Sequence, residues 1–166
     1  LTTKHHDGFC LFESELTDYS TTGTAAGRDF VAEYVEAFRK HGLRIGLYYS
    51  LGDWRFPAYF DGPGKDPGAF QEFLAYTHQQ VRELCTNYGR IDVLWFDGGW
   101  PHNAATWESE RLDRMIRKLQ PHVMINDRLH GGGGGNVIPV GKASRRKLGY
   151  FDTAEQRAPD QQTVQR

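Results

Sequence analysis

The sequence predicts an α/β fold of about four to five strand–helix units, which form part of a parallel (β/α)8 TIM-like barrel. Short runs of β-forming residues alternate along the chain with longer segments whose apolar residues repeat at helical spacing. This alternation indicates βα units and a parallel sheet. A doubly wound open sheet is the competing fold, but no G-x-G-x-x-G motif follows a predicted strand.

The first half of the chain contains two of these units. Leu1–Lys4 is the first predicted strand. A helix is expected over Asp29–Lys40, where apolar side chains form one stripe and Gly42 follows as a C-terminal stop. Arg44–Tyr49 is the second predicted strand. Ser50–Gly68 is rich in proline and glycine, so a long polar loop that shapes a site is expected there.

The second half continues the same alternation. A helix is expected over Ala69–Tyr88. The nearly continuous apolar run Ile91–Phe96 is typical of a parallel strand that is buried on both faces. A further helix over Ala105–Leu119 leads to a fourth predicted strand at His122–Asn126. A fifth strand is expected at Gly149–Asp152.

Composition excludes several classes of partner. The chain has 166 residues, of which 39% are hydrophobic and 25% charged, and its formal net charge is -1. This balance provides no strong field for nucleic acid or a membrane surface, and no apolar run reaches the roughly 18 residues of a membrane span. A complete barrel needs about 250 residues, so residues 1–166 are expected to be its central part, without the early and closing strands.

Polar side chains gather where the predicted strands end. These are His5–Asp7, Tyr48–Ser50, Asp97, Asn126–Arg128, and Asp152 with Glu155. In a (β/α)8 barrel the C-terminal ends of the strands form one face, and active sites lie on that face. The coincidence of these clusters with strand ends therefore indicates an active site.

Asp97 is the strongest single candidate among these residues. It follows the apolar third strand, and Gly98 and Gly99 are expected to leave room for a ligand beside it. Trp95 and Trp100 offer flat apolar walls, on which the C–H faces of sugars pack well. The structural alternative is that Asp97 caps a helix or a turn.

A second carboxylate would complete a glycosidase centre. A retaining glycosidase needs two carboxyl groups about 5–5.5 Å apart, of which one attacks the anomeric carbon and one shuttles the proton. Asp97 and Glu155 could form this pair at the barrel mouth. The alternative for Glu155 is a solvated surface side chain.

The two histidines and the arginine could bind sugar hydroxyls. Neutral imidazoles both donate and accept hydrogen bonds, so His5 and His6 suit this role. They could instead bind a metal ion with Asp97, although neighbours on a strand point to opposite faces unless the strand has ended. Arg128 could give a forked hydrogen bond to hydroxyls or a carboxylate, or form an ion pair with Asp127 or Asp152.

Five short motifs follow one another along most of the chain. They are Thr3-Lys4-His5-His6-Asp7-Gly8-Phe9, Gly46-Leu47-Tyr48-Tyr49-Ser50, Leu94-Trp95-Phe96-Asp97-Gly98, Asn126-Asp127-Arg128 and Asp152-Thr153-Ala154-Glu155. Together they resemble the α-L-fucosidases of glycoside hydrolase family 29. The resemblance implies a (β/α)8-like catalytic domain that removes α-linked L-fucose with retention of configuration. It implies no metal and no organic cofactor.

The resemblance also assigns roles to the two carboxylates. Asp97 matches the family's nucleophile, and Glu155 falls where members with a Thr-Ala/Pro-Glu motif place the acid/base. The implied substrate is a fucosylated oligosaccharide or glycoconjugate. Residues 1–166 would then be the central part of a glycosidase catalytic barrel, without the family's C-terminal β-sandwich.

The remaining matches line the pocket. His5 and His6 match paired histidines that contact the fucose hydroxyls, Tyr49 and Arg128 match a tyrosine and an arginine of the same pocket, and Trp95 would lie beside the nucleophile. Two alternatives stay open: a metal-dependent TIM-barrel hydrolase, and a sugar-binding barrel without catalytic chemistry.

Overall fold

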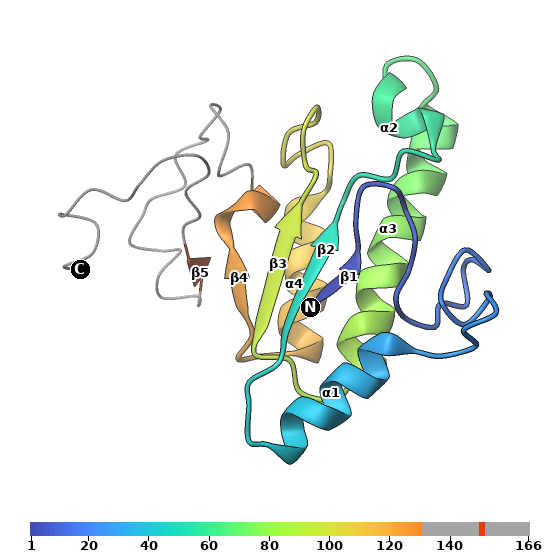
Figure 1. Ribbon diagram of the computed structural model, residues 1–166. Helices are drawn as coiled ribbons and strands as arrows, with labels where there is room; N and C mark the ends of the chain where they lie inside the picture. Colours follow the sequence, from blue (N-terminus) through green and yellow to red (C-terminus); the bar gives the residue numbers. More distant parts are fainter. Residues whose placement is uncertain (131–149, 152–166) are drawn as a thin grey trace, which may run out of the picture.

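The computed structural model describes residues 1–130 and 150–151 (Figure 1). Within this part of the chain, five strands form one parallel sheet in the order β1-β2-β3-β4-β5. The strands are β1 (Thr2–Lys4), β2 (Gly46–Ser50), β3 (Val93–Asp97), β4 (Met124–Asn126) and β5 (Tyr150–Phe151). Strands that follow one another in sequence are neighbours in the sheet, without the reversal of order that marks a doubly wound fold. The order therefore agrees with the predicted barrel topology.

Helices connect the strands and cover the sheet. They are α1 (Phe30–Lys40), α2 (Pro57–Asp61), α3 (Pro67–Asn87), α4 (Ser109–Leu119) and the short 3-10 helix η1 (Asp127–His130). In Figure 1, α4 lies behind the strands, and α3 is drawn to the right of β1. The hydrogen bond from Tyr49 of β2 to Gln80 shows that α3 packs on the sheet. No helix among residues 1–130 is long and apolar enough to cross a membrane.

Local sequence signals set the starts of α1 and α3. Asp29 caps α1, because its side chain accepts a hydrogen bond from the Ala32 N–H. Asp66 caps α3 in the same way, and Pro67 occupies the first helical turn, where no N–H is needed. The predicted helices at Asp29–Lys40 and Ala69–Tyr88 are thus confirmed to within about two residues.

The predicted loop over Ser50–Gly68 contains a helix that the sequence pattern did not indicate. Pro57 starts the five-residue helix α2, and Tyr59 within it is buried at 3% exposure. A helix of five residues is too short to show an apolar stripe, since one turn takes 3.6 residues. The expectation of a polar loop over this segment was wrong at Leu51, Ala58 and Tyr59, which belong to the core.

The core lies between the sheet and its helices, and strand alternation decides which side chains enter it. On β3, Leu94 and Phe96 are buried toward the helices, while Trp95 and Asp97 are half-buried on the opposite face. Burial on both faces of β3, which its apolar run suggested, is therefore complete only on the helix side in the described residues. Asp97 sits at the C-terminal end of the strand.

Candidate active site

Asp97 lies at the centre of a cluster of polar side chains at the C-terminal edge of the sheet. The Tyr48 hydroxyl, from β2, donates a hydrogen bond to Asp97 Oδ2 at 2.9 Å. Arg128 Nη1, from η1, donates to Asp97 Oδ1 at 2.8 Å, and the two side chains of this ion pair are 10% and 14% exposed. Three elements far apart in sequence thus meet on one carboxylate.

This arrangement keeps Asp97 ionised. Partial burial opposes the charge, but hydrogen bonds from the Gly98 N–H, Tyr48 and Arg128, together with the Arg128 charge, outweigh burial and hold the pKa of the Asp97 carboxyl below its usual value. The two carboxylate oxygens have about four lone pairs between them, so these three hydrogen bonds leave room for a further contact. An ionised carboxylate held in one orientation is suited to act as a nucleophile.

The tyrosine of this cluster is Tyr48 and not Tyr49, for which a pocket role was predicted. β2 and β3 pair with Tyr48 beside Trp95 and Tyr49 beside Phe96, so Tyr48 shares the face of Asp97 and Tyr49 faces the helices. Tyr49 is 1% exposed, and its hydroxyl donates to Gln80 Oε1 at 2.8 Å. Its position in the core does not support the predicted contact with a ligand.

His5 and His6 come together in the turn that follows β1. Because β1 ends at Lys4, the two imidazoles are not forced to opposite faces, and their ring centroids are 4.0 Å apart. His5 also stacks on Tyr48, with centroids 5.4 Å apart and planes 8° from parallel. The backbone of this turn is held by a hydrogen bond from the Trp54 N–H to the His6 carbonyl at 2.8 Å.

The hydrogen bonds of His6 define its tautomer. The Ser50 hydroxyl donates its single proton to the Gly52 carbonyl at 2.8 Å, so Ser50 Oγ accepts from His6 Nδ1–H at 2.7 Å. Burial, and next the neighbouring His5, lower the pKa of His6. Neutral His6 therefore presents its other nitrogen, Nε2, as a hydrogen-bond acceptor.

Gly98 was expected to leave room for a ligand beside Asp97, but the structure places protein atoms there. Its φ is +65°, and a Cβ there would lie 2.5 Å from Ser50 Oγ and 3.1 Å from His6 Nδ1. The space beside Gly98 is therefore filled by protein atoms and is not room for a ligand. Only glycine lets the chain after Asp97 approach the His6–Ser50 hydrogen bond this closely.

Aromatic side chains border the cluster on two sides. Trp95 is half-buried, and the guanidinium carbon of Arg128 lies 5.8 Å from its ring centre. Trp54 and Trp100 are 58% and 57% exposed, and their ring centroids lie 5.7 and 5.3 Å from that of His6. Trp54 was not singled out from the sequence, although it lies in the loop expected to shape a site.

The structure brings together Asp97, His5, His6, Arg128 and, beside them, Trp95, as the sequence predicted. Glu155 lies outside the described residues, so its role stays a prediction. Among residues 1–130 no group of three or more His, Cys, Asp or Glu side chains is arranged to hold a metal ion.

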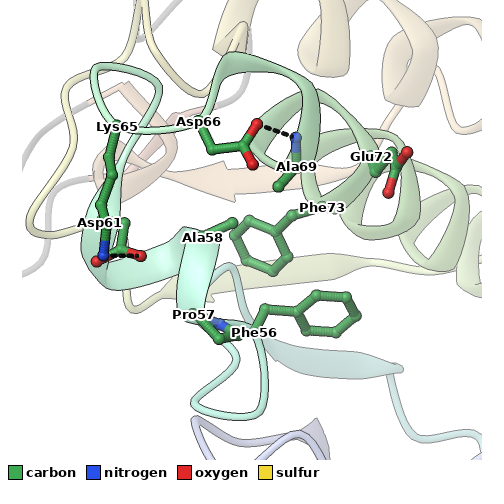
Figure 2. Close-up of a pocket in the computed structure, with 9 residues that line it drawn as sticks. All are labelled: Phe56, Pro57, Ala58, Asp61, Lys65, Asp66, Ala69, Glu72 and Phe73. Carbon is green, nitrogen blue, oxygen red and sulfur yellow. Dashed lines mark hydrogen bonds and ion pairs between the residues drawn. The ribbon is translucent and has the colours of Figure 1, made fainter.

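A cavity of about 290 Å³ lies elsewhere, between α2 and α3 (Figure 2). It is lined by Phe56, Pro57, Ala58, Asp61, Lys65, Asp66, Ala69, Glu72 and Phe73. An ion pair between Lys65 and Asp61, at 2.9 Å, lies at its side. None of the strand-end residues lines this cavity. The convergent polar groups at the sheet edge are therefore the better candidate for an active site.

Comparisons with known proteins show the family of the chain. A sequence model of the family described as Alpha-L-fucosidase matches residues 1–166. Alpha-L-fucosidase 1 of Arabidopsis thaliana is 37% identical over 136 residues, which are 75% of this chain and 24% of that protein. The chain therefore spans about a quarter of the length of this curated relative.

Solved structures similar to this chain are also alpha-L-fucosidases. Alpha-L-fucosidase isoenzyme 1 from Paenibacillus thiaminolyticus is 49% identical with a TM-score of 0.69, covering 79% of this chain and 34% of that one. A trapped covalent intermediate of a GH29 alpha-L-fucosidase from Bacteroides thetaiotaomicron, in complex with 2-fluoro-fucosyl fluoride, is 30% identical with a TM-score of 0.73, covering 91% and 40%. The catalytic domain of these GH29 enzymes is a (β/α)8 barrel, which confirms the predicted fold class. The chain belongs to the alpha-L-fucosidase family.

Proposed function

We propose that this chain carries the catalytic centre of a retaining α-L-fucosidase in which Asp97 is the nucleophile. The observation that carries the proposal is the ionised Asp97 carboxylate at the end of β3, held by Tyr48 and Arg128. Hydrolysis with retention passes through a covalent glycosyl-enzyme intermediate. The trapped covalent intermediate of the Bacteroides thetaiotaomicron relative supports the same route here.

In the first step, an Asp97 oxygen attacks the anomeric carbon of a terminal L-fucose while the bond to the leaving oxygen breaks. Tyr48 and Arg128 orient the carboxylate for this attack, since each holds one of its two oxygens. Glu155 gives its proton to the leaving oxygen. The products of the step are a fucosyl ester on Asp97 and the free aglycone.

In the second step, water replaces Asp97 at the anomeric carbon. Glu155, now ionised, takes a proton from the water, and the C–O bond of the ester breaks to release fucose and the Asp97 carboxylate. Two inversions give net retention. The substrate of the whole protein is accordingly a fucosylated oligosaccharide or glycoconjugate.

The remaining side chains bind the sugar. Neutral His6 accepts a hydrogen bond from a fucose hydroxyl at Nε2, and His5 beside it supplies a further donor or acceptor. Trp95 forms an apolar wall on the Asp97 side. Tyr48 takes the place of the pocket tyrosine that was expected at Tyr49.

The test is substitution of Asp97 in the full-length protein. Asp97→Ala should abolish cleavage of an aryl α-L-fucoside, and added azide should restore part of the turnover by attacking from the vacated side. Asp92→Ala is the matched control, because Asp92 lies just before β3, at its other end, and its side chain is also 14% exposed. Unchanged turnover in Asp97→Ala would refute the proposal.

A further inference from the structure

The end of β4 is joined to β3 by a side chain in place of the backbone. The ladder between the two strands pairs Val93 with Met124 and Leu94 with Ile125. Beyond these pairs, the Asn126 carboxamide takes over. Its Oδ1 accepts a hydrogen bond from the Phe96 N–H at 2.8 Å, and its Nδ2 donates to the Phe96 carbonyl at 2.8 Å.

The reason is the direction of the chain after Asn126. At Asp127 the backbone leaves the sheet and enters η1, so the β4 ladder stops short of Phe96. A side-chain carboxamide carries the same donor and acceptor as a peptide group and can extend the ladder by one residue. Asn126 and Phe96 are both 0% exposed, so these hydrogen bonds replace water that cannot reach the two backbone groups.

The two hydrogen bonds between the Asn126 carboxamide and the Phe96 backbone, here called the clamp, lie close in sequence to both partners of the Asp97–Arg128 ion pair. Phe96 directly precedes Asp97, and Asn126 stands two residues before Arg128. One carboxamide therefore links the strand that ends in Asp97 to the start of the turn that carries Arg128. In this arrangement Arg128 Nη1 lies 2.8 Å from Asp97 Oδ1.

We propose that Asn126 is a positioning residue for the catalytic reaction, which sets the Asp97–Arg128 contact by clamping Phe96 while the chain turns into η1. This inference rests on the proposed role of Asp97 as the nucleophile. Asn126 does not touch the substrate, since its carboxamide is used by the Phe96 backbone.

The pKa of Asp97 can be used to test whether the clamp holds the Arg128 contact in place. Among residues 1–130, the titratable and charged groups that act on Asp97 are Tyr48 on β2, His6 after β1, Tyr59 on α2 and Arg128 on η1. Of these, only Arg128 lies on the segment that Asn126 begins. Loosening the clamp should therefore weaken the Arg128 contact and raise the pKa of Asp97, by up to about one unit.

The experiment compares two buried carboxamides that act at opposite ends of β3. Gln120, at 5% exposure, accepts from the Ile91 N–H at 3.1 Å and donates to the Cys85 and Gly89 carbonyls, both at 2.8 Å. Gln120→Ala removes a similar clamp and should lower Tm without changing the acid limb of the pH profile of kcat/KM. Asn126→Ala should lower Tm, reduce kcat/KM about tenfold or more, and move that limb to higher pH.

Folding and function can be separated in this design. If Asn126→Ala does not fold, Asn126→Ser keeps a hydroxyl for one of the two bonds and is measured in the same way. An acid limb that stays at its wild-type position in a folded Asn126 variant would overturn the inference. A wild-type protein that cleaves no fucoside would overturn the proposed function instead. In that case the pKa of Asp97 would be measured directly, from the 13C chemical shift of its carboxyl group in wild type and in Asn126→Ala. An equal pKa in the two proteins would overturn the inference.

Discussion

The Tyr48 hydroxyl donates to Oδ2 of Asp97 at 2.9 Å, across the gap between two neighbouring parallel strands. The register places Tyr48 beside Trp95, two residues before Asp97 on the same face of the sheet. A tyrosine side chain is long enough to reach forward from that position to the end of the strand. Tyr48 therefore helps to orient the carboxylate and to keep it charged.

Removal of this hydroxyl should impair catalysis without unfolding the protein. A hydrogen bond to a charged group contributes about 1.5–3 kcal/mol, so Tyr48→Phe should lower kcat/KM on an aryl fucoside by roughly one to two orders of magnitude. Tyr48 is only half-buried, so Tm should change little. Steady-state kinetics and thermal unfolding of the purified full-length variant measure the two effects.

Tyr49→Phe is the matched control for that substitution. The Tyr49 hydroxyl bonds Gln80 in the core, and its loss leaves a buried acceptor without this donor. We expect a loss of about 1–3 kcal/mol in stability with nearly unchanged kcat. The reverse result, with Tyr49→Phe inactive and Tyr48→Phe active, would show that the assignment of the two tyrosines is wrong.

The pH profile should depend on Arg128. Hydrogen bonds and the Arg128 charge hold the pKa of Asp97 below its usual value against the effect of burial. Activity needs ionised Asp97, so it should be lost only as the pH falls through this lowered pKa. In Arg128→Met the acid limb of kcat/KM should move up by about 1–3 units. An acid limb at the same pH in both proteins would contradict the ionic role of Arg128.

Much of the fold was predictable because its signals are local. The caps Asp29 and Asp66 lie next to the residues that begin α1 and α3, and the apolar run before Asp97 marks β3 directly. α2 could not be found in this way, since five residues do not complete two helical turns. Its start at Pro57 was the one local signal.

The site was predictable in its location but not in all its contacts. Tyr48 and Tyr49 are chemically identical neighbours, and a register shift of one residue would exchange their faces. Only the pairing of β2 with β3 decides between them. The environment of Gly98 also depends on segments distant in sequence, because Ser50 and His6 fill the space beside it.

Gly98→Ala should be more damaging than a usual glycine-to-alanine change. The positive φ alone disfavours alanine by about 1 kcal/mol, and the new Cβ would lie 2.5 Å from Ser50 Oγ. We expect displacement of Asp97 or His6 and a loss of at least tenfold in kcat/KM. Gly42→Ala is the control, because Gly42 has a φ of +68° with no atom within 4 Å of a Cβ. Equal activity of the two variants would contradict the close-approach argument.

The buried ion pair beneath the histidine turn should produce a measurable pH dependence of stability. Lys4 Nζ lies 3.7 Å from Asp53 Oδ2, and both side chains are 0% exposed. Burial lowers the pKa of Lys4 from 10.5 to about 8, although Asp53 opposes the shift. Between these two values the unfolded chain holds a proton that the folded chain has lost, so Lys4 makes stability rise with pH across this window. Below pH 8 Lys4 is charged in the folded chain, and the free-energy cost of burying this charge is fully present.

Lys4→Met removes this titration while Asp53 keeps its ion pair with Arg55 at 2.9 Å. The stability of the variant relative to wild type should therefore be greatest below pH 8 and should fall by on the order of 3 kcal/mol as the pH rises to 10.5. Groups that titrate in this range without interacting with Lys4 are present in both proteins and cancel in the difference. The Cys10 thiol does not cancel, because Lys4 lowers its pKa, so Lys4→Met and its reference protein both carry Cys10→Ala. Urea unfolding of both proteins at several pH values between 7 and 10.5 measures it. A difference that stays constant over this range would show that Lys4 keeps its ordinary pKa in the fold.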